Sequence, residues 1–175
     1  MTTNLLELEQ TYQQVKNRTT PAYLDLLNLM RAEYEEQGEE EKCLKICSEM
    51  IQLILTDKIK KDNLDIILLA AYDTRARLGD FRAYCIALEW NRPIDRQFFL
   101  PRKRILEKHG LIQAMQDMAD DKLDFLFISL PPRIGKSTLG LFFLTFMAGR
   151  FPDRSILGNG HSTSLTQAFY NEVLN

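Results

Sequence analysis

Residues 124–138 have the sequence Asp-Phe-Leu-Phe-Ile-Ser-Leu-Pro-Pro-Arg-Ile-Gly-Lys-Ser-Thr, in which an apolar run leads directly into a glycine-lysine-serine turn. A continuous apolar run of this length is typical of a strand covered on both faces, as in a parallel sheet. An apolar helix is expected next, over about 136–147, then a short second strand at 155–158 and a helix at 165–174. This order of strand, helix, strand and helix predicts the opening of a doubly wound α/β domain.

The turn matches the second half of the phosphate-binding pattern G-x-x-x-x-G-K-[ST], whereas Leu130 stands where the first glycine is expected. Gly135 lets the backbone curl so that successive N–H groups point at a phosphate, beside the positive end of the following helix. Lys136 supplies a compact positive charge for the β- and γ-phosphates, and Ser137 supplies a hydroxyl group to Mg²⁺. The alternative is a Gly-Lys-Ser helix start that binds no ligand.

The loop at 130–138 resembles the variant Walker A loop of tailed-bacteriophage terminase large subunits, the ATPase motors of DNA packaging. That family typically has Pro-Pro-Arg-x-Gly-Lys-Ser/Thr and commonly lacks the first glycine, so Leu130 agrees with it. Further resemblances lie in the basic-aromatic segment 96–102, in 149–153, in Gly160-His161-Ser162 and in Leu165 and Phe169. The resemblance covers about 90–175.

The resemblance implies an ATP and Mg²⁺ site. Its expected nucleotide-binding residues are Gln97, Pro132, Arg133, Ile134, Gly135, Lys136, Ser137 and Thr138, with Ser137 also the Mg²⁺ ligand. Lys136 and Arg133 are the expected catalytic residues, because Arg133 would sense or stabilise the γ-phosphate; the alternative is an arginine that caps the loop or pairs with a carboxylate. Gln97 would bind the adenine edge with Phe98 or Phe99 stacking nearby, unless these rings form a core pair.

The region before the loop has a different character. Residues 1–90 are expected to form helices, with a start at Thr20-Pro21, breaks at Gly38 and Gly79-Asp80, and Asn63 capping a further helix after the basic residues 58–61. An ordinary helical bundle is favoured over a two-helix repeat of the tetratricopeptide kind. A helix at about 102–118 should be interrupted near Gly110. The predicted domains are therefore a helical region at 1–90 and the beginning of a P-loop ATPase domain at 91–175.

The predicted ATPase domain lacks one expected part. A phosphate loop needs a later apolar strand ending in Asp-Glu, and no such strand follows Ser137. We therefore expect an incomplete P-loop sheet, truncated before the Walker B acid, in the N-terminal portion of a terminase large subunit. Such a fragment would bind ATP weakly at best and not hydrolyse it alone. The alternatives are another helicase-like P-loop NTPase, or a helical protein-interaction module with a vestigial loop.

Composition limits the remaining possibilities. The 175 residues carry a net charge of −2, but 92–108 hold six basic and two acidic side chains, which suits an anion such as DNA or a triphosphate. No apolar run is long enough for a membrane span, and three unevenly spaced cysteines indicate a reducing compartment. The resemblance implies double-stranded viral DNA, the terminase small subunit and the portal as partners. It also implies a homo-oligomeric ring at full length and a location in the bacterial host cytoplasm.

Three other groups of residues have two interpretations each. The acidic residues Asp117, Asp120, Asp121 and Asp124 could form a nuclease metal cluster, but a solvated turn is the simpler interpretation. Cys43 and Cys47 share a helix face and could bind a metal, although buried small apolar side chains are expected instead. His109 and His161 are isolated; His161 either faces nucleotide or DNA or shapes its loop.

Overall fold

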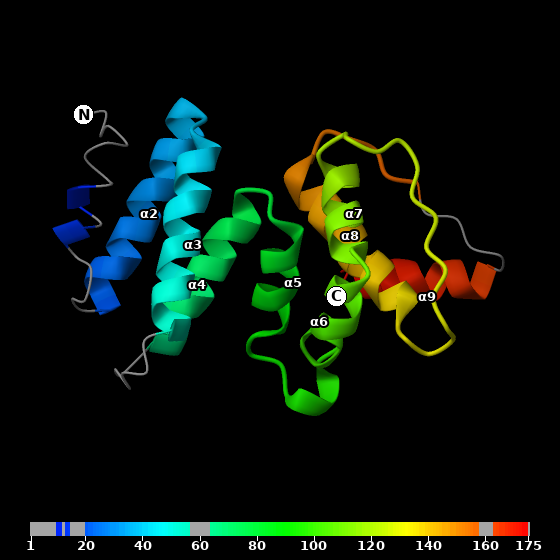
Figure 1. Ribbon diagram of the computed structural model, residues 1–175. Coiled ribbons are helices and arrows are strands. Elements are labelled where there is room, and N and C mark those ends of the chain that lie inside the picture. Colours follow the sequence, from blue (N-terminus) through cyan, green and yellow to red (C-terminus); the bar gives the residue numbers. More distant parts are fainter. Residues whose placement is uncertain (1–9, 12, 15–19, 57–63, 158–162, 175) are drawn as a thin grey trace. The chain divides into compact units, whose positions relative to one another are not determined.

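The computed structural model describes residues 10–11, 13–14, 20–56, 64–157 and 163–174. The chain divides into two compact units, Met1–Trp90 and Asn91–Asn175. Throughout the part of the chain that is described, the regular secondary structure is helical (Figure 1). Among these helices, none is both long enough and apolar enough to cross a membrane.

In the first unit the described residues include the helices α2 (Thr20–Gln37), α3 (Glu40–Thr56), α4 (Leu64–Arg77) and α5 (Phe81–Glu89). Helix α4 packs against each of the other three. Apolar positions at helical spacing meet in its core, which includes Leu26, Met30, Cys43, Cys47, Met50, Ala71 and Phe81. The predicted helices of this region are confirmed, because a helix forms wherever one apolar face can be buried against a neighbour.

Local signals end and begin these helices where the sequence indicates. Gly38, with φ of +67°, follows α2 in the left-handed conformation that glycine adopts without strain. The Asp80 carboxylate caps α5 by accepting a hydrogen bond of 2.8 Å from the Ala83 N–H. Asp80 also forms an ion pair of 2.5 Å with Arg75 of α4, so the cap is tied to the preceding helix. The predicted cap at Asn63 and the basic residues 58–61 lie outside the described residues.

The second unit contains the 3₁₀ turn η1 (Ile94–Arg96) and the helices α6 (Phe99–Lys108), α7 (Leu111–Ala119), α8 (Lys136–Arg150) and α9 (Thr163–Leu174). Helix α6 packs against α7, and α8 packs against α9. Its buried side chains include Phe99, Leu106, Ile112, Met115, Leu139, Phe142 and Phe146. The helix predicted at 136–147 is confirmed and extends three residues further, to Arg150.

Gly110 separates α6 from α7. Its φ of +68° lies in the left-handed region, so the backbone cannot continue as one helix through this residue. The predicted interruption near Gly110 is confirmed. The two helices contact each other across this short connection, and Leu106 and Met115 are both buried.

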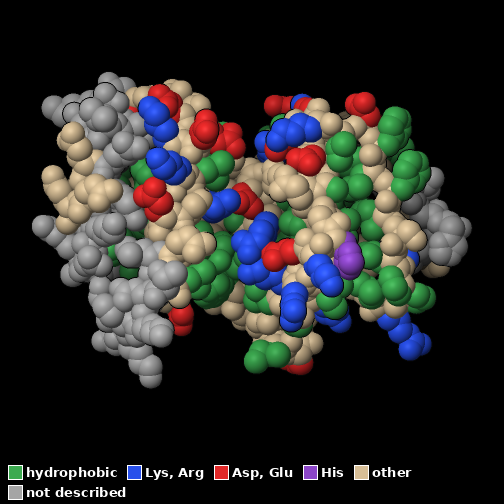
Figure 2. Space-filling model, in the orientation of Figure 1, with side chains coloured by type: hydrophobic (Ala, Val, Ile, Leu, Met, Phe, Trp, Pro, Cys, Tyr) green, Lys and Arg blue, Asp and Glu red, His purple; other side chains and the backbone are tan. Residues whose placement is uncertain are grey.

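The prediction of an α/β fold with a parallel sheet is wrong. Residues 124–130 are not helical, but no strand occurs anywhere in the described residues. The side chains that a sheet would cover lie in solvent, with Phe125 79% and Phe127 93% exposed, and hydrophobic side chains gather along this stretch in Figure 2. At the second predicted strand, Leu157 is 94% exposed and Gly158 lies outside the described residues.

This prediction failed because a β-strand forms only where its backbone can pair with a neighbouring strand. An apolar run provides the side chains for a buried strand, but only hydrogen bonds to another strand make it one. Periodicity reports the first property and says nothing about the second. The expected start of a P-loop sheet is therefore replaced by an exposed segment that leads from α7 to the loop before α8.

Candidate nucleotide site

The glycine-lysine-serine turn begins helix α8. Gly135 is the residue before the helix and has φ of +91° and ψ of 37°. Its carbonyl oxygen accepts the first helical hydrogen bond, of 3.0 Å, from the Leu139 N–H, and no side chain caps the helix. The first N–H groups of an α-helix have no partner within the helix, so those of α8 can serve an anion.

Two polar side chains of the predicted site stand at this helix start. Lys136 and Ser137 are both exposed, in the first turn of α8, and Thr138 beside them is half-buried. The Lys136 ammonium donates a hydrogen bond of 2.8 Å to the carbonyl oxygen of Leu130, at the other end of the loop. The loop therefore holds its lysine through a main-chain oxygen, a contact that sequence inspection could not identify.

The rest of the loop presents an arginine to solvent. Pro132 and Arg133 are exposed and Ile134 is half-buried. Arg133 has φ of +65°, a left-handed conformation that costs a residue with a side chain of the order of 1 kcal/mol or more. Arg133 and Gly135 thus both have positive φ, in a short loop that ends at a helix start.

The segment before α6 contacts this loop through Phe98. A Cβ atom built on Gly135 would lie 2.7 Å from Cδ2 and 3.1 Å from Cζ of Phe98, and closer still to Cε2. The ring therefore occupies the space that a side chain at 135 would need. Gln97, the residue before Phe98, is half-buried and donates a hydrogen bond of 2.9 Å from Nε2 to the Arg92 carbonyl oxygen.

The aromatic pair itself is part of the core. Phe98 is 9% exposed and Phe99 is fully buried, so neither presents a free ring face for stacking on a base in this structure. This favours the core alternative for the two rings. The contact between Phe98 and Gly135 nevertheless brings the segment that contains Gln97 to the phosphate-type loop.

The basic side chains of segment 92–108 include two that lie against aromatic rings and several that are exposed. The guanidinium groups of Arg92 and Arg102 lie 5.8 Å and 5.3 Å from the ring centroids of Phe142 and Phe98. These arginines therefore pack on aromatic rings of the core. Arg96, Arg104 and Lys108 are exposed, and Lys and Arg side chains gather over α6 in Figure 2.

These groups fit a triphosphate and its cation. Lys136 offers the charge, Ser137 the hydroxyl oxygen and the start of α8 the N–H groups. Most of the donors are exposed, so no rearrangement of the core is needed for access.

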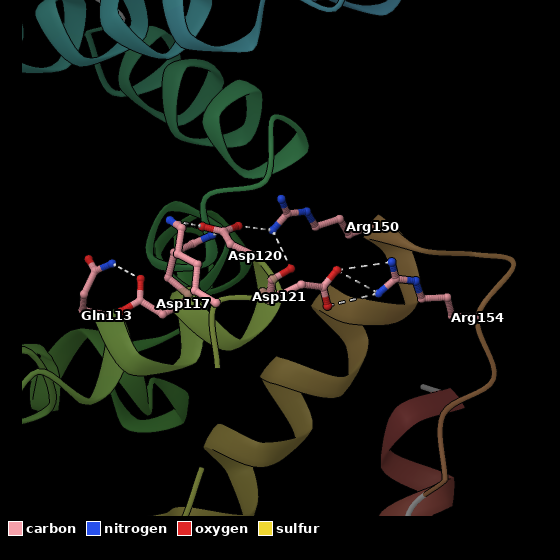
Figure 3. A network of polar contacts seen from close by, with 9 residues as sticks. Gln113, Asp117, Asp120, Asp121, Arg150 and Arg154 are labelled. Atoms are coloured by element: carbon pink, nitrogen blue, oxygen red, sulfur yellow. Dashed lines mark hydrogen bonds and ion pairs between the residues drawn. The ribbon is translucent and has the colours of Figure 1, made fainter. Parts of the chain in front are cut away.

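Two acidic residues after α7 form ion pairs with arginines at the end of α8 and just beyond it (Figure 3). Asp120 Oδ1 lies 2.7 Å from Arg150 Nη1, and Asp121 Oδ2 lies 3.4 Å from Arg154 Nη2. Asp117 accepts a hydrogen bond of 2.9 Å from Gln113. Within the described residues, no three Asp, Glu, His or Cys side chains are placed to hold a metal ion. Asp120 and Asp121 thus link the turn after α7 to arginines at the end of α8 and just beyond it.

The neighbours of the Asp120 carboxylate change its pKa. Partial burial by itself would raise its pKa. Hydrogen bonds from Arg150, Gln116 and Lys122 favour the charged form and outweigh burial, so the pKa lies below its usual range.

The cysteines are buried thiols in the first unit. Cys43 Sγ donates to the Met30 carbonyl oxygen at 3.5 Å, and Cys47 and Cys85 are buried beside other apolar side chains. Burial raises the pKa of Cys47 to about 12 and also raises that of Cys43. The burial of Cys43 and Cys47 confirms the prediction that they are small buried side chains.

The remaining predicted positions are less informative. His109 is exposed at the end of α6. Gly160, His161 and Ser162 lie outside the described residues, and so do the side chains of Leu165 and Phe169 in α9. Comparison of the chain with protein-family models, with curated proteins and with solved structures found no match in any of the three.

Proposed function

We propose that this chain binds ATP at the start of α8 and is the ATP-binding part of a phage terminase large subunit, the motor that moves viral DNA into procapsids. The observation that carries the proposal is the placement of exposed Lys136 and Ser137 in the first turn of a helix that no side chain caps, directly after Gly135. The resemblance of residues 130–138 to the variant Walker A loop supplies the particular class of motor.

In this proposal each loop residue has a separate task. The Lys136 ammonium leaves the Leu130 carbonyl and binds the β- and γ-phosphates, and the N–H groups of the first turn bind phosphate oxygens. The Ser137 hydroxyl holds Mg²⁺, which neutralises phosphate charge when bound. Arg133, exposed beside them, stabilises negative charge at the γ-phosphate.

The proposed partners follow from the class of motor and from charge. Double-stranded DNA, the terminase small subunit and the portal are the partners, a homo-oligomeric ring is the working form, and the bacterial host cytoplasm is its location. The exposed basic side chains Arg96, Arg104 and Lys108 support an anionic partner, because phosphates attract such side chains without regard to base sequence.

Calorimetric titration with Mg-ATP tests the nucleotide site. The wild-type chain should bind, and Lys136→Ala should weaken binding at least about tenfold, or ~1.4 kcal/mol. Ser137→Ala should reduce the dependence of affinity on Mg²⁺. Lys42→Ala is the matched control, because it removes the same charge from an exposed position of α3. No heat with Mg-ATP in the wild type would contradict the proposal and favour a helical interaction module.

A second measurement separates a packaging motor from another helicase-like NTPase. Duplex and single-stranded DNA of equal length compete for the chain at one stated salt concentration. A packaging motor should retain the duplex, with an affinity that falls as salt rises. Preference for the single strand would instead favour the helicase-like alternative.

A further inference from the structure

The three heavy atoms nearest to a Cβ built on Gly135 all belong to Phe98, which lies more than thirty residues earlier in the chain, just before α6. We propose that Phe98 is a positioning residue that sets the backbone conformation of the loop at 130–135, so that movement of the segment at 97–102 regulates nucleotide binding. The inference rests on the proposed function and deepens it by naming what controls the loop.

The contact with Gly135 leaves little freedom on either side. The ring lies where a Cβ of residue 135 would be, with Cδ2 at 2.7 Å and Cζ at 3.1 Å from that position. Gly135 holds φ of +91°, a conformation that glycine can also leave easily. A ring seated against its Cα face therefore selects one of the several conformations available to this residue.

The ring is itself held from two other directions. It packs edge to face on Phe142 of α8, with centroids 5.9 Å apart and planes at 85°. In α6, four residues further along the chain, the Arg102 guanidinium lies 5.3 Å from the ring centroid, and its Nη1 donates a hydrogen bond of 3.1 Å to the Phe98 carbonyl oxygen. Phe98 is thus connected to α6, to α8 and to the loop at once.

These contacts also link Phe98 to Gln97, the residue expected to bind the adenine base. Arg92 lies over Phe142, and the Arg92 carbonyl oxygen accepts the hydrogen bond from Gln97. A ligand that draws Gln97 away from Arg92 pulls on the residue next to Phe98. Because packed interiors transmit displacements and do not absorb them, the loop at Gly135 responds to that movement.

The first test compares affinities for Mg-ATP. Phe98→Ala should weaken binding about tenfold, because donors of the loop are no longer held in one geometry. Phe98→Leu, which keeps an apolar group of similar reach, should recover part of that loss. Phe146→Leu is the matched control, since it removes a buried ring from α8 that is not among the nearest neighbours of Gly135. Circular dichroism verifies that every variant compared is folded.

The second test needs no nucleotide. In a chain labelled at glycine, the ring current of Phe98 should displace the Gly135 Hα resonances from the positions that they have without the ring. Phe98→Ala and Phe98→Leu should abolish this displacement, whereas Phe146→Leu and Lys136→Ala should keep it.

The two tests distinguish the possible failures. A resonance displacement that survives Phe98→Ala, or wild-type affinity for Mg-ATP in folded Phe98→Ala, would overturn the positioning role. A wild-type chain that shows the displacement but binds no Mg-ATP would overturn the proposed function, and the regulatory role with it, while leaving the contact as packing.

Discussion

The Lys136 ammonium donates a hydrogen bond of 2.8 Å to the carbonyl oxygen of Leu130, the residue at the position of the usual first glycine. A main-chain oxygen is present whatever the side chain, so the departure from the common pattern at 130 does not prevent the loop from closing on its lysine. The exposed contact contributes little to folding, because water can replace it. In the proposed function this contact holds the Lys136 ammonium at the loop before a phosphate binds.

We expect Arg133 to lower the stability of the folded chain while contributing to the proposed Mg-ATP binding. Its φ of +65° favours glycine, so Arg133→Gly should raise the free energy of unfolding by about 0.5–1 kcal/mol in urea while weakening Mg-ATP binding. Arg133→Asn, which tolerates this conformation better than most residues, should show a smaller gain. A loss of stability in Arg133→Gly would show instead that the guanidinium makes a stabilising contact, as the carboxylate-pairing alternative requires.

Asp120 and Asp121 are neighbours that should differ in their effect on stability. Asp120→Asn should lower the free energy of unfolding by about 1–2 kcal/mol, because a half-buried ion pair of 2.7 Å with Arg150 is lost. Asp121→Asn, at 3.4 Å from Arg154 with both side chains more than half exposed, should cost less than about 0.5 kcal/mol. Equal effects in urea unfolding would mean that the junction between α7 and α8 is not as the structure has it.

The same pair predicts a dependence on pH. The pKa of Asp120 is lower in the folded chain than in the unfolded chain, so its contribution is complete above the unfolded value of about 3.9. The contribution is lost as pH falls through the lower folded value, because the carboxylate must then be protonated. Wild type and Asp120→Asn should therefore differ in stability at pH 7 and converge toward pH 2 in thermal unfolding.

Two glycines should respond in opposite ways to the same substitution. Gly110→Ala should destabilise by about 1 kcal/mol, because φ of +68° strains alanine although the added Cβ meets nothing within 4 Å. Gly140→Ala lies inside α8 with equally open space, and should stabilise by about 0.5–1 kcal/mol through helix propensity. Thermal unfolding of both variants measures the difference. Effects of the same sign would contradict the break between α6 and α7.

Substitutions of Phe127 and Phe142 test whether the apolar segment at 124–130 is exposed to solvent. Phe127→Ser should change stability by no more than about 0.5 kcal/mol, because this side chain is 93% exposed. Phe142→Ser removes a ring that is 3% exposed and should cost about 3–5 kcal/mol. A large cost at Phe127 in urea unfolding would show that the segment is covered, as its apolar pattern predicts.

The features that could be predicted from the sequence alone depend on interactions between residues close together in the chain. The helices of the first unit, the cap at Asp80, the break at Gly110 and the helix start at Gly135 each depend on residues a few positions apart. Helix hydrogen bonds join residue i to i−4, so the pattern and its cause lie in the same short window. For the same reason the glycine, lysine and serine of the candidate site could be located before any fold was known.

Only the tertiary structure decided the pairings between distant positions. The apolar run at 124–130 satisfies the pattern of a strand, yet in the described residues no second strand pairs with it. The contact of Phe98 with Gly135 and the ion pair of Asp120 with Arg150 likewise join separate elements. Such contacts depend on how helices pack once formed, and side-chain periodicity along one segment contains no information about which partner it meets.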